Sequence, residues 1–324
     1  MDEKIVNISR DDIQKFCEKV IEEVKNVDPS LIFNADETGV QEFADSTKYH
    51  AIVSSQVKED IYYYSVRRSQ KLFTVLPCIS LMGKSTIPLI ITSRLTEDND
   101  VSSLGMFPDK HYSLVHSEKG YVTRNIFYNW CEKIFIPFVY ITREENNLPP
   151  FSKAIIFFDN CSSHKDQKIM DLLAEHNIKV LPFVPHTSHI CQMLDLVTFS
   201  VFKGQINKFT PELKPYTQAF MINQILHAIQ QATIPFNNVS AFRKAGIQTF
   251  DSKTVTFDPS KIMERFNEDN SMTIPIHFRA IPWNQTSGST QKNQNDSPIS
   301  QEIPIEKNSI SKRKKPRTKL LPPQ

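Results

Sequence analysis

The sequence predicts an α/β protein with a central mixed β-sheet. Apolar, β-rich segments alternate with amphipathic segments along the chain, which is the pattern of strands interleaved with helices. Two of the apolar segments lead into an aspartate within a few residues, and two others flank a short turn, as in a hairpin. The chain has 324 residues, 40% of them hydrophobic, so it is long enough for one large domain or two ordinary ones.

The predicted helices are amphipathic. Ser9 can cap the first one, over residues 9–27, where Asp11 and Asp12 lie in the first turn and apolar residues recur at helical spacing. The later helices complete the ordered body that we expect. They span residues 123–141, 165–176, about 190–207, about 217–231 and a shorter segment near 240–245.

The predicted strands are short and strongly apolar. A first run at residues 31–33 breaks at Asn34 and leads into Asp36. A continuously apolar run at residues 154–158 is typical of a strand covered on both faces, and it leads into Asp159. The remaining segments are a hairpin of residues 71–81 and 86–92 around a turn at 82–85, and a strand at 179–184.

The formal net charge of +2 hides an uneven distribution. Residues 307–324 contain seven bases and no acid, so the rest of the chain holds 31 bases and all 36 acids, a net charge of −5. From about residue 284 the sequence is polar and low in complexity, which predicts disorder. We expect the basic stretch to be a nuclear localisation signal or a non-specific DNA contact, with a solubilising end as the alternative. Its bases are Lys312, Arg313, Lys314, Lys315, Arg317 and Lys319.

The cysteines and the absence of long apolar runs predict a soluble protein of a reducing, intracellular compartment, with no membrane partner. No cysteine pair has the C-x-x-C spacing of a zinc or redox site. The first residues lack the features of a signal peptide, and no uncharged apolar run approaches the roughly 18–20 residues that span a bilayer. The five cysteines are Cys17, Cys78, Cys131, Cys161 and Cys191.

Two aspartates are candidate metal ligands because of where their strands end. A carboxylate just past a buried strand lies at the sheet edge, where α/β proteins bind ligands. Taken singly, Asp36 or Asp159 is more typical of a turn or a helix cap. If their strands are neighbours, the two can share a divalent cation, and oxygen ligands favour Mg²⁺ or Mn²⁺. Asp195 lies off the apolar stripe of its helix, so periodicity alone indicates a solvated acid.

Three segments resemble the acidic motifs of the DDE superfamily: FNADETGV (33–40), IIFFDNCSSH (155–164) and PHTSHICQMLDLVTFSVFK (185–203). They are most similar to the transposase domain of the pogo/Tigger/Jerky type, which is related to Tc1/mariner transposases and also occurs in centromere protein B-like proteins. The resemblance covers roughly residues 28–250, with 122 and 35 residues between successive acids.

The resemblance implies an RNase H-like fold and a catalytic triad of Asp36, Asp159 and Asp195 that binds Mg²⁺ or Mn²⁺ in a two-metal site. The chemistry would be cleavage of DNA phosphodiester bonds and strand transfer. DNA is the expected partner, with a homo-oligomer on DNA as an open question, and the nucleus is the expected location. Polar neighbours of the acids are second-shell candidates: Glu37, Asn160 and His164.

The resemblance also implies a domain organisation. We expect a leader helix at 1–27, the DDE-type domain at 28–250, a C-terminal extension at 251–283 and a disordered basic tail at 284–324. Proteins of this type usually carry an N-terminal helix-turn-helix region. Only about 30 residues precede the first motif here, so we expect that region to be missing. The alternative to an enzyme is a domesticated, catalytically silent protein that binds DNA or chromatin. Basic residues are candidate DNA contacts or a solvated face: Arg67, Arg68, Lys71, Lys203 and Lys208.

Overall fold

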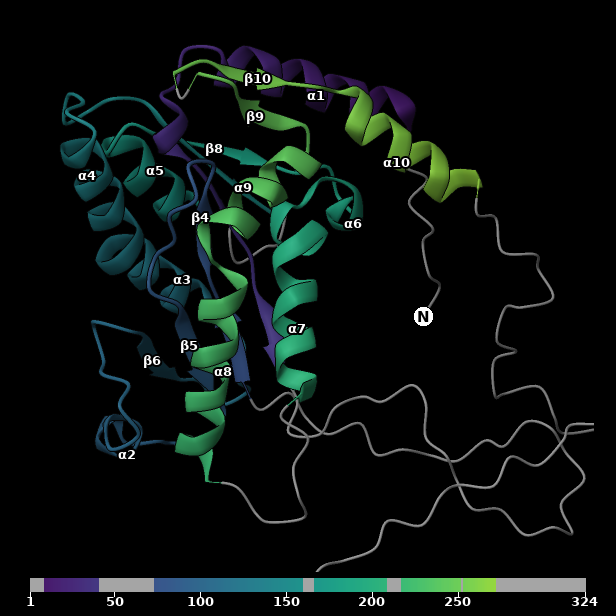
Figure 1. Ribbon diagram of the computed structural model, residues 1–324. Helices are drawn as coiled ribbons and strands as arrows, with labels where there is room; N and C mark the ends of the chain where they lie inside the picture. Colours follow the sequence, from purple (N-terminus) through teal and green to yellow (C-terminus); the bar gives the residue numbers. More distant parts are fainter. Residues whose placement is uncertain (1–8, 41–72, 160–165, 209–216, 252, 272–324) are drawn as a thin grey trace, which may run out of the picture. The chain divides into compact units, whose positions relative to one another are not determined.

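The computed structural model describes residues 9–40, 73–159, 166–208, 217–251 and 253–271 (Figure 1). All of them belong to one compact unit, Met1–Thr273, whereas the second unit, Ile274–Gln324, lies outside the described residues. The expected disorder of residues 284–324 therefore stays a prediction. Candidate residues that also lie outside the described part are Arg67, Arg68, Lys71, Asn160, His164 and the six bases at 312–319.

The described strands form two four-stranded sheets and a small hairpin. Their bounds are Ile32–Ala35 (β1), Thr38–Val40 (β2), Phe73–Leu76 (β3), Cys78–Ser80 (β4), Leu89–Thr92 (β5), Ser113–His116 (β6), Ala154–Phe158 (β7), Ile178–Pro182 (β8), Ile247–Thr249 (β9) and Val255–Phe257 (β10). One sheet has the order β4-β1-β7-β8, in which β1, β7 and β8 are parallel and β4 is antiparallel to β1. The other has the order β2-β3-β5-β6, in which only the β5–β6 pair is parallel.

The two sheets meet at Asp36. The pairing of β1 with β4 and that of β2 with β3 keep one register across the gap, and this register places Asp36 opposite Pro77. The Leu81 N–H donates to the Ile32 carbonyl at 2.9 Å, and hydrogen-bonded pairs alternate along an antiparallel ladder, so the Asp36–Pro77 pair falls at a hydrogen-bonding position. Proline has no N–H to donate, which explains why the ladder is interrupted here.

Through this junction the strands run in the order β6, β5, β3–β4, β1–β2, β7, β8, where β3–β4 is antiparallel to both β5 and β1–β2, and β1, β7 and β8 are parallel. In Figure 1, helices α3, α4 and α5 lie on one side of the strands and α7, α8 and α9 on the other. The expected RNase H-like α/β fold is thereby confirmed. The helices are Arg10–Val24 (α1), Asp98–Ser102 (α2), Arg124–Trp130 (α3), Ile136–Glu145 (α4), Gln167–Glu175 (α5), Ser188–Cys191 (α6), Phe199–Lys208 (α7), Gln218–Ala232 (α8), Pro235–Lys244 (α9) and Ser260–Ser271 (α10), with a 3₁₀ turn at Pro29–Leu31 (η1) and π-helical turns at Cys131–Phe135 (η2) and Leu194–Thr198 (η3).

The first helix is an integral part of the core. Ser9 caps α1 as predicted: the Ser9 hydroxyl accepts from the Asp12 N–H, and the Asp12 carboxylate accepts from the Ser9 N–H. Ile21, one of the apolar residues of this helix, is 44% exposed. The buried residues of the helix share one hydrophobic cluster with the sheet, so α1 packs with the fold rather than apart from it. They are Ile13, Phe16, Cys17, Val20 and Val24.

The ordered body extends further than the sequence predicts. The expectation that it ends near residue 245 is wrong, because β9, β10 and α10 follow. Ile262 and Phe266 of α10 join the same core as the sheet. The two strands have three residues each, too few to show an alternating pattern. Gly246 initiates this extension with φ +90°, where a Cβ would lie 2.4 Å from the Asp258 carbonyl oxygen.

Candidate acidic site at the sheet edge

Asp36 and Asp159 follow neighbouring parallel strands in register. Asn34 of β1 pairs with Phe157 of β7, and the same offset two residues later places Asp36 beside Asp159. Adjacent strands lie about 4.8 Å apart, and residues side by side on them face the same way. The condition that the two strands be neighbours is therefore met. The carboxyl ends of β1 and β7 bring both aspartates to one edge of the sheet.

Asp36 experiences negative charge from several directions. Burial raises the pKa of the Asp36 carboxyl well above its usual 3.8, and the carboxylates of Glu37, Asp195 and Asp159 raise it further. A hydrogen bond with the backbone of Glu37 acts in the opposite direction. Each charged side chain that contributes to this shift is thus a carboxylate. The site stores electrostatic repulsion that a bound cation would relieve.

Asp195 lies in η3 and its side chain is exposed. Partial desolvation raises the pKa of Asp195, Lys203 and His189 oppose the increase, and Asp159 adds to it. Asp195 is close enough to raise the pKa of Asp36, and Asp159 is close enough to raise the pKa of Asp195. We call Asp36, Asp159 and Asp195 the acidic edge. Helical periodicity did not reveal this placement.

The continuous helix expected at 190–207 is wrong, and the break decides where Asp195 lies. Helix α6 ends at Cys191, Gln192 is extended with φ −74° and ψ 114°, and η3 begins at Leu194. In a continuous helix the Leu194 N–H would donate to the Ile190 carbonyl. Instead it donates to the Asn34 side-chain oxygen at 3.1 Å, and the Ile190 carbonyl accepts from Arg265 Nε at 2.8 Å. A π-helical turn then replaces regular α-helix around Asp195.

The acidic edge has the donor chemistry of a divalent-cation site. Its candidate ligands are all carboxylate oxygens, which Mg²⁺ and Mn²⁺ prefer, and their mutual repulsion fits a cationic guest. Among the described residues, no group of three or more His, Cys, Asp or Glu side chains is gathered tightly enough to hold a metal ion. The three aspartates influence one another electrostatically without forming a closed ligand shell.

The other predicted site residues divide into two groups. Glu37 lies next to Asp36, is half-buried and contributes to the acidic environment. Asn160 and His164 lie outside the described residues, so their second-shell roles stay predictions. Lys203 is exposed but close enough to lower the pKa of Asp195, whereas Lys208 contacts Gln205 at 3.2 Å.

Sequence reasoning missed Asn34, which it interpreted as the end of a strand. Asn34 lies within β1 and is 0% exposed, between the core residues Phe33 and Ala35. A polar residue inside an apolar run was the available signal. Gln192 is equally buried and was missed because it was assigned to a regular helix.

An apolar cleft of about 590 Å³ lies elsewhere, between the β5–β6 region and the helices α3 and α4. Val115, Ile126 and Phe138 are among its lining residues. None of the three aspartates of the acidic edge lines it. The acidic edge and this cleft are therefore separate places on the protein.

The fold and the acidic edge define an RNase H-like domain with aspartates after its central strands. A family model described as DDE superfamily endonuclease matches residues 70–241, more than half of the chain. The chain therefore belongs to the DDE superfamily endonuclease family. The matched region contains Asp159 and Asp195 and begins after Asp36.

Solved structures with a similar arrangement include the Mos1 mariner transposase. The Mos1 paired-end complex with Mn is 12% identical, with a TM-score of 0.46, and the match covers 82% of this chain and 64% of that one. The Mos1 catalytic domain with Raltegravir and Mg is 11% identical, with a TM-score of 0.44, over 81% of this chain and 96% of that one. The paired-end complex of Mos1 with the left transposon end is also similar, with a TM-score of 0.39 and 11% identity over 74% of this chain and 63% of that one.

A curated relative is named MFS-type transporter clz9 and comes from Cochliobolus lunatus. It is 24% identical over 188 residues, which is 56% of this chain and 19% of that protein. The chain thus spans about a fifth of that relative, and the transporter name describes the relative as a whole. Within the part of the chain that the structure describes, no helix combines the length and apolar composition needed to cross a bilayer.

Proposed function

We propose that this chain is a metal-dependent DNA endonuclease and strand-transfer domain of the DDE type, with Asp36, Asp159 and Asp195 as its catalytic carboxylates. The observation that carries the proposal is the convergence of negative charge at the carboxyl ends of β1 and β7. Family membership supports the reaction class. The buried repulsion at Asp36 disfavours the fold unless a cation offsets it, which favours a functional over a structural role.

The proposed roles follow from where each carboxylate is anchored. Asp36 and Asp159 come from adjacent strands and would hold Mg²⁺ or Mn²⁺ from one side. Asp195 would approach from η3 and complete the ligand set. The chemistry that two cations would supply there is activation of a water or 3′-hydroxyl and stabilisation of the leaving oxygen in an in-line displacement. Glu37, Asn160 and His164 would orient these ligands through hydrogen bonds.

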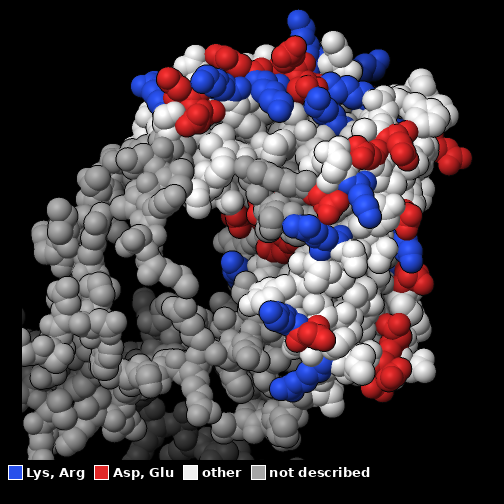
Figure 2. Space-filling view, turned by 180° about the vertical axis from the view of Figure 1, so that it is seen from behind, with Lys and Arg blue, Asp and Glu red and all other residues white. Residues whose placement is uncertain are grey.

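DNA is the proposed partner. Figure 2 shows acidic and basic side chains interspersed over the visible face rather than a continuous basic surface. Phosphate contacts dominate DNA affinity, so the bound cations, Lys203 and His189 would supply positive charge close to the acids. The chain would bind DNA alone or as a homo-oligomer. The bases at 312–319 would direct the chain to the nucleus or add a non-specific DNA contact.

The test is cleavage of supercoiled plasmid DNA by the purified full chain in Mg²⁺ or Mn²⁺. We expect nicking that requires the cation and is abolished by Asp159→Asn. Glu145→Gln is the matched control, because Glu145 is an acid on α4 that pairs with Lys84 away from the acidic edge. Nicking that persists in Asp159→Asn, or wild-type protein without nicking, would overturn the proposal. DNA binding without cleavage would favour the catalytically silent alternative.

A further inference from the structure

Asn34 is a fully buried amide in the middle of the central strand. It is 0% exposed, and β1 is buried along its whole length. Buried polar groups persist in folded proteins when they are hydrogen-bonded, because burying an unpaired amide costs free energy. The amide therefore has a role that its contacts explain.

The Asn34 side chain connects the three segments that carry the acidic edge. Its Nδ2 donates to the Phe157 carbonyl on β7 at 3.0 Å and to Gln192 Oε1. Its Oδ1 accepts from the Leu194 N–H at 3.1 Å. Asn34 and Phe157 each lie two residues before an aspartate of the acidic edge, and Leu194 directly precedes the third. One side chain thus contacts all three segments within one or two residues of their acids.

The geometry of β1 puts this contact on the same side as the site. Residues i and i+2 of a strand face the same way, so the Asn34 amide lies behind the Asp36 carboxylate. The pairing of Asn34 with Phe157 is the same register that aligns Asp36 with Asp159. The amide is therefore one step deeper in the sheet than the carboxylate pair.

The contact with Leu194 also determines where the Asp195 helix begins. The Leu194 N–H donates to Asn34 Oδ1 and therefore not to the Ile190 carbonyl. That carbonyl instead accepts a hydrogen bond from Arg265 Nε. Asn34 acts here as an N-cap supplied from a distant strand. It permits the extended turn at Gln192 and places Asp195 in the first turn of η3.

We infer that Asn34, supported by Gln192, is a positioning residue that sets the distance of Asp195 from Asp36 and Asp159. This inference rests on the proposed function, because the spacing matters through the cation that the three carboxylates would share. Groups that orient metal ligands without touching the metal typically change metal affinity or activity about 10–100-fold when mutated. Asn34 is placed to have an effect of that size.

The experiment measures Mn²⁺ affinity and thermal stability of the full chain in parallel. Asn34→Leu keeps a similar volume and removes all three hydrogen bonds. Gln192→Met keeps Asn34 and removes one acceptor, which is a milder change. We expect Mn²⁺ binding, measured by calorimetry, to weaken about 10–100-fold in Asn34→Leu and by a smaller factor in Gln192→Met.

Asn238→Leu is the matched control. Asn238 is also 0% exposed, and its Nδ2 donates to the carbonyls of Gly83 at 2.8 Å and Thr233 at 2.9 Å. Gly83 lies in the hairpin turn after β4, beyond the end of β1 opposite to Asp36. This variant should lose stability to a similar degree and keep wild-type Mn²⁺ affinity.

The outcomes separate the inference from the proposed function. Wild-type protein that binds no Mn²⁺, or binding that Asp159→Asn leaves unchanged, defeats the proposed function and the inference with it. Wild-type binding that depends on Asp159, together with unchanged affinity in Asn34→Leu, defeats the inference alone. Equal loss of affinity in Asn34→Leu and Asn238→Leu does so too. If Asn34→Leu does not fold, Gln192→Met decides: weakened binding at wild-type stability supports the inference, and unchanged affinity rejects it.

Discussion

Carboxylates at the two ends of the central parallel strands have opposite electrostatic surroundings. At the start of β7 and β8, Glu23 of α1 contacts Lys153 at 2.6 Å and Lys179 at 3.6 Å. The hydrogen bond from Lys153 is the main reason why the pKa of Glu23 lies below its usual 4.5. At the other end, burial and neighbouring carboxylates hold the pKa of Asp36 well above its usual 3.8. The charge of the neighbouring groups, rather than the number of acids, therefore explains the opposite pKa shifts at the two ends.

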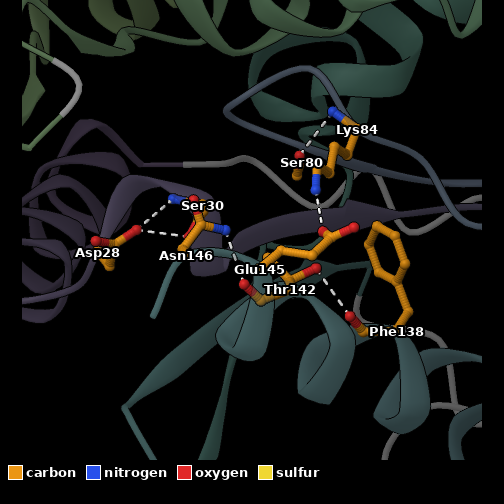
Figure 3. Close-up of polar contacts among 8 residues, drawn as sticks. All are labelled: Asp28, Ser30, Ser80, Lys84, Phe138, Thr142, Glu145 and Asn146. Carbon is orange, nitrogen blue, oxygen red and sulfur yellow. Dashed lines mark hydrogen bonds and ion pairs between the residues drawn. The ribbon is translucent and has the colours of Figure 1, made fainter. Parts of the chain in front are cut away.

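Near the start of β1, as around Glu23, polar and charged groups are paired with partners (Figure 3). Lys84 of the hairpin turn pairs with Glu145 of α4, and the Lys84 N–H donates to Ser80 Oγ at 3.0 Å. Asp28 accepts from the N–H and hydroxyl of Ser30 at 2.9 and 2.6 Å. These groups satisfy one another and stabilise the fold. The acidic edge concentrates charge of one sign, and this contrast can be tested by substitution.

The largest expected effect is at Asp36. Asp36→Asn should lower the proposed cleavage rate by roughly 10³-fold, because a metal-ligand carboxylate contributes several kcal/mol to the transition state. The same change should raise the free energy of unfolding without metal by about 1 kcal/mol, since it removes a buried repulsion. Plasmid nicking and urea unfolding measure the two effects. A variant that is both inactive and less stable would contradict this account of the acidic edge.

The next effect is stabilisation by the cation itself. Mn²⁺ at about 100 times its dissociation constant should stabilise the folded chain by about 2.7 kcal/mol. Thermal unfolding with and without Mn²⁺ measures the shift. Glu23→Gln should keep the full shift, because Glu23 lies at the other end of the strands. An equal shift in Asp36→Asn would show that the cation binds elsewhere.

A smaller effect is expected at Glu23, which pairs with two lysines at the start of β7 and β8. Glu23→Gln should cost about 1 kcal/mol at pH 7, because its lysine partners are partly exposed and solvent screens the pair. The pKa of Glu23 is lowered in the fold, so its contribution is present above its usual 4.5 and declines as the pH falls through the lowered pKa. Urea unfolding at pH 7 and at pH 3 should therefore show a difference between wild type and variant that shrinks in acid. A difference independent of pH would contradict the ion-pair explanation.

The smallest effect is expected at Glu145. Its pair with Lys84 is about half exposed on both sides, so Glu145→Gln should cost no more than about 0.5 kcal/mol. High salt should remove most of that cost through screening. Unfolding measured at low and at high salt tests this. A cost that survives high salt would mean that Glu145 stabilises the hairpin turn by another route.

The fold and the site were predictable to different extents. The apolar run of β7 and the aspartate after it were evident, because a strand buried on both faces needs no alternation. Asn34 was taken as a strand end, since local propensity does not show which distant groups satisfy a buried amide. The helix break before Asp195 was missed for the same reason: it depends on Asn34 and Arg265, which are far away in sequence. Hydrogen bonds between segments that are distant in the sequence leave no pattern in the local sequence.

The proline opposite Asp36 has a mechanical consequence. A sheet resists bending where its ladder is continuous, and Pro77 removes one rung where β4-β1-β7-β8 meets β2-β3-β5-β6. The two four-stranded sheets are thus joined where this hydrogen bond is missing, and Asp36 lies at that junction. We expect bending at this junction to shift Asp36 relative to Asp159, which follows the uninterrupted parallel pair. We therefore expect the strands to bend more easily beside Asp36 than within either four-stranded sheet.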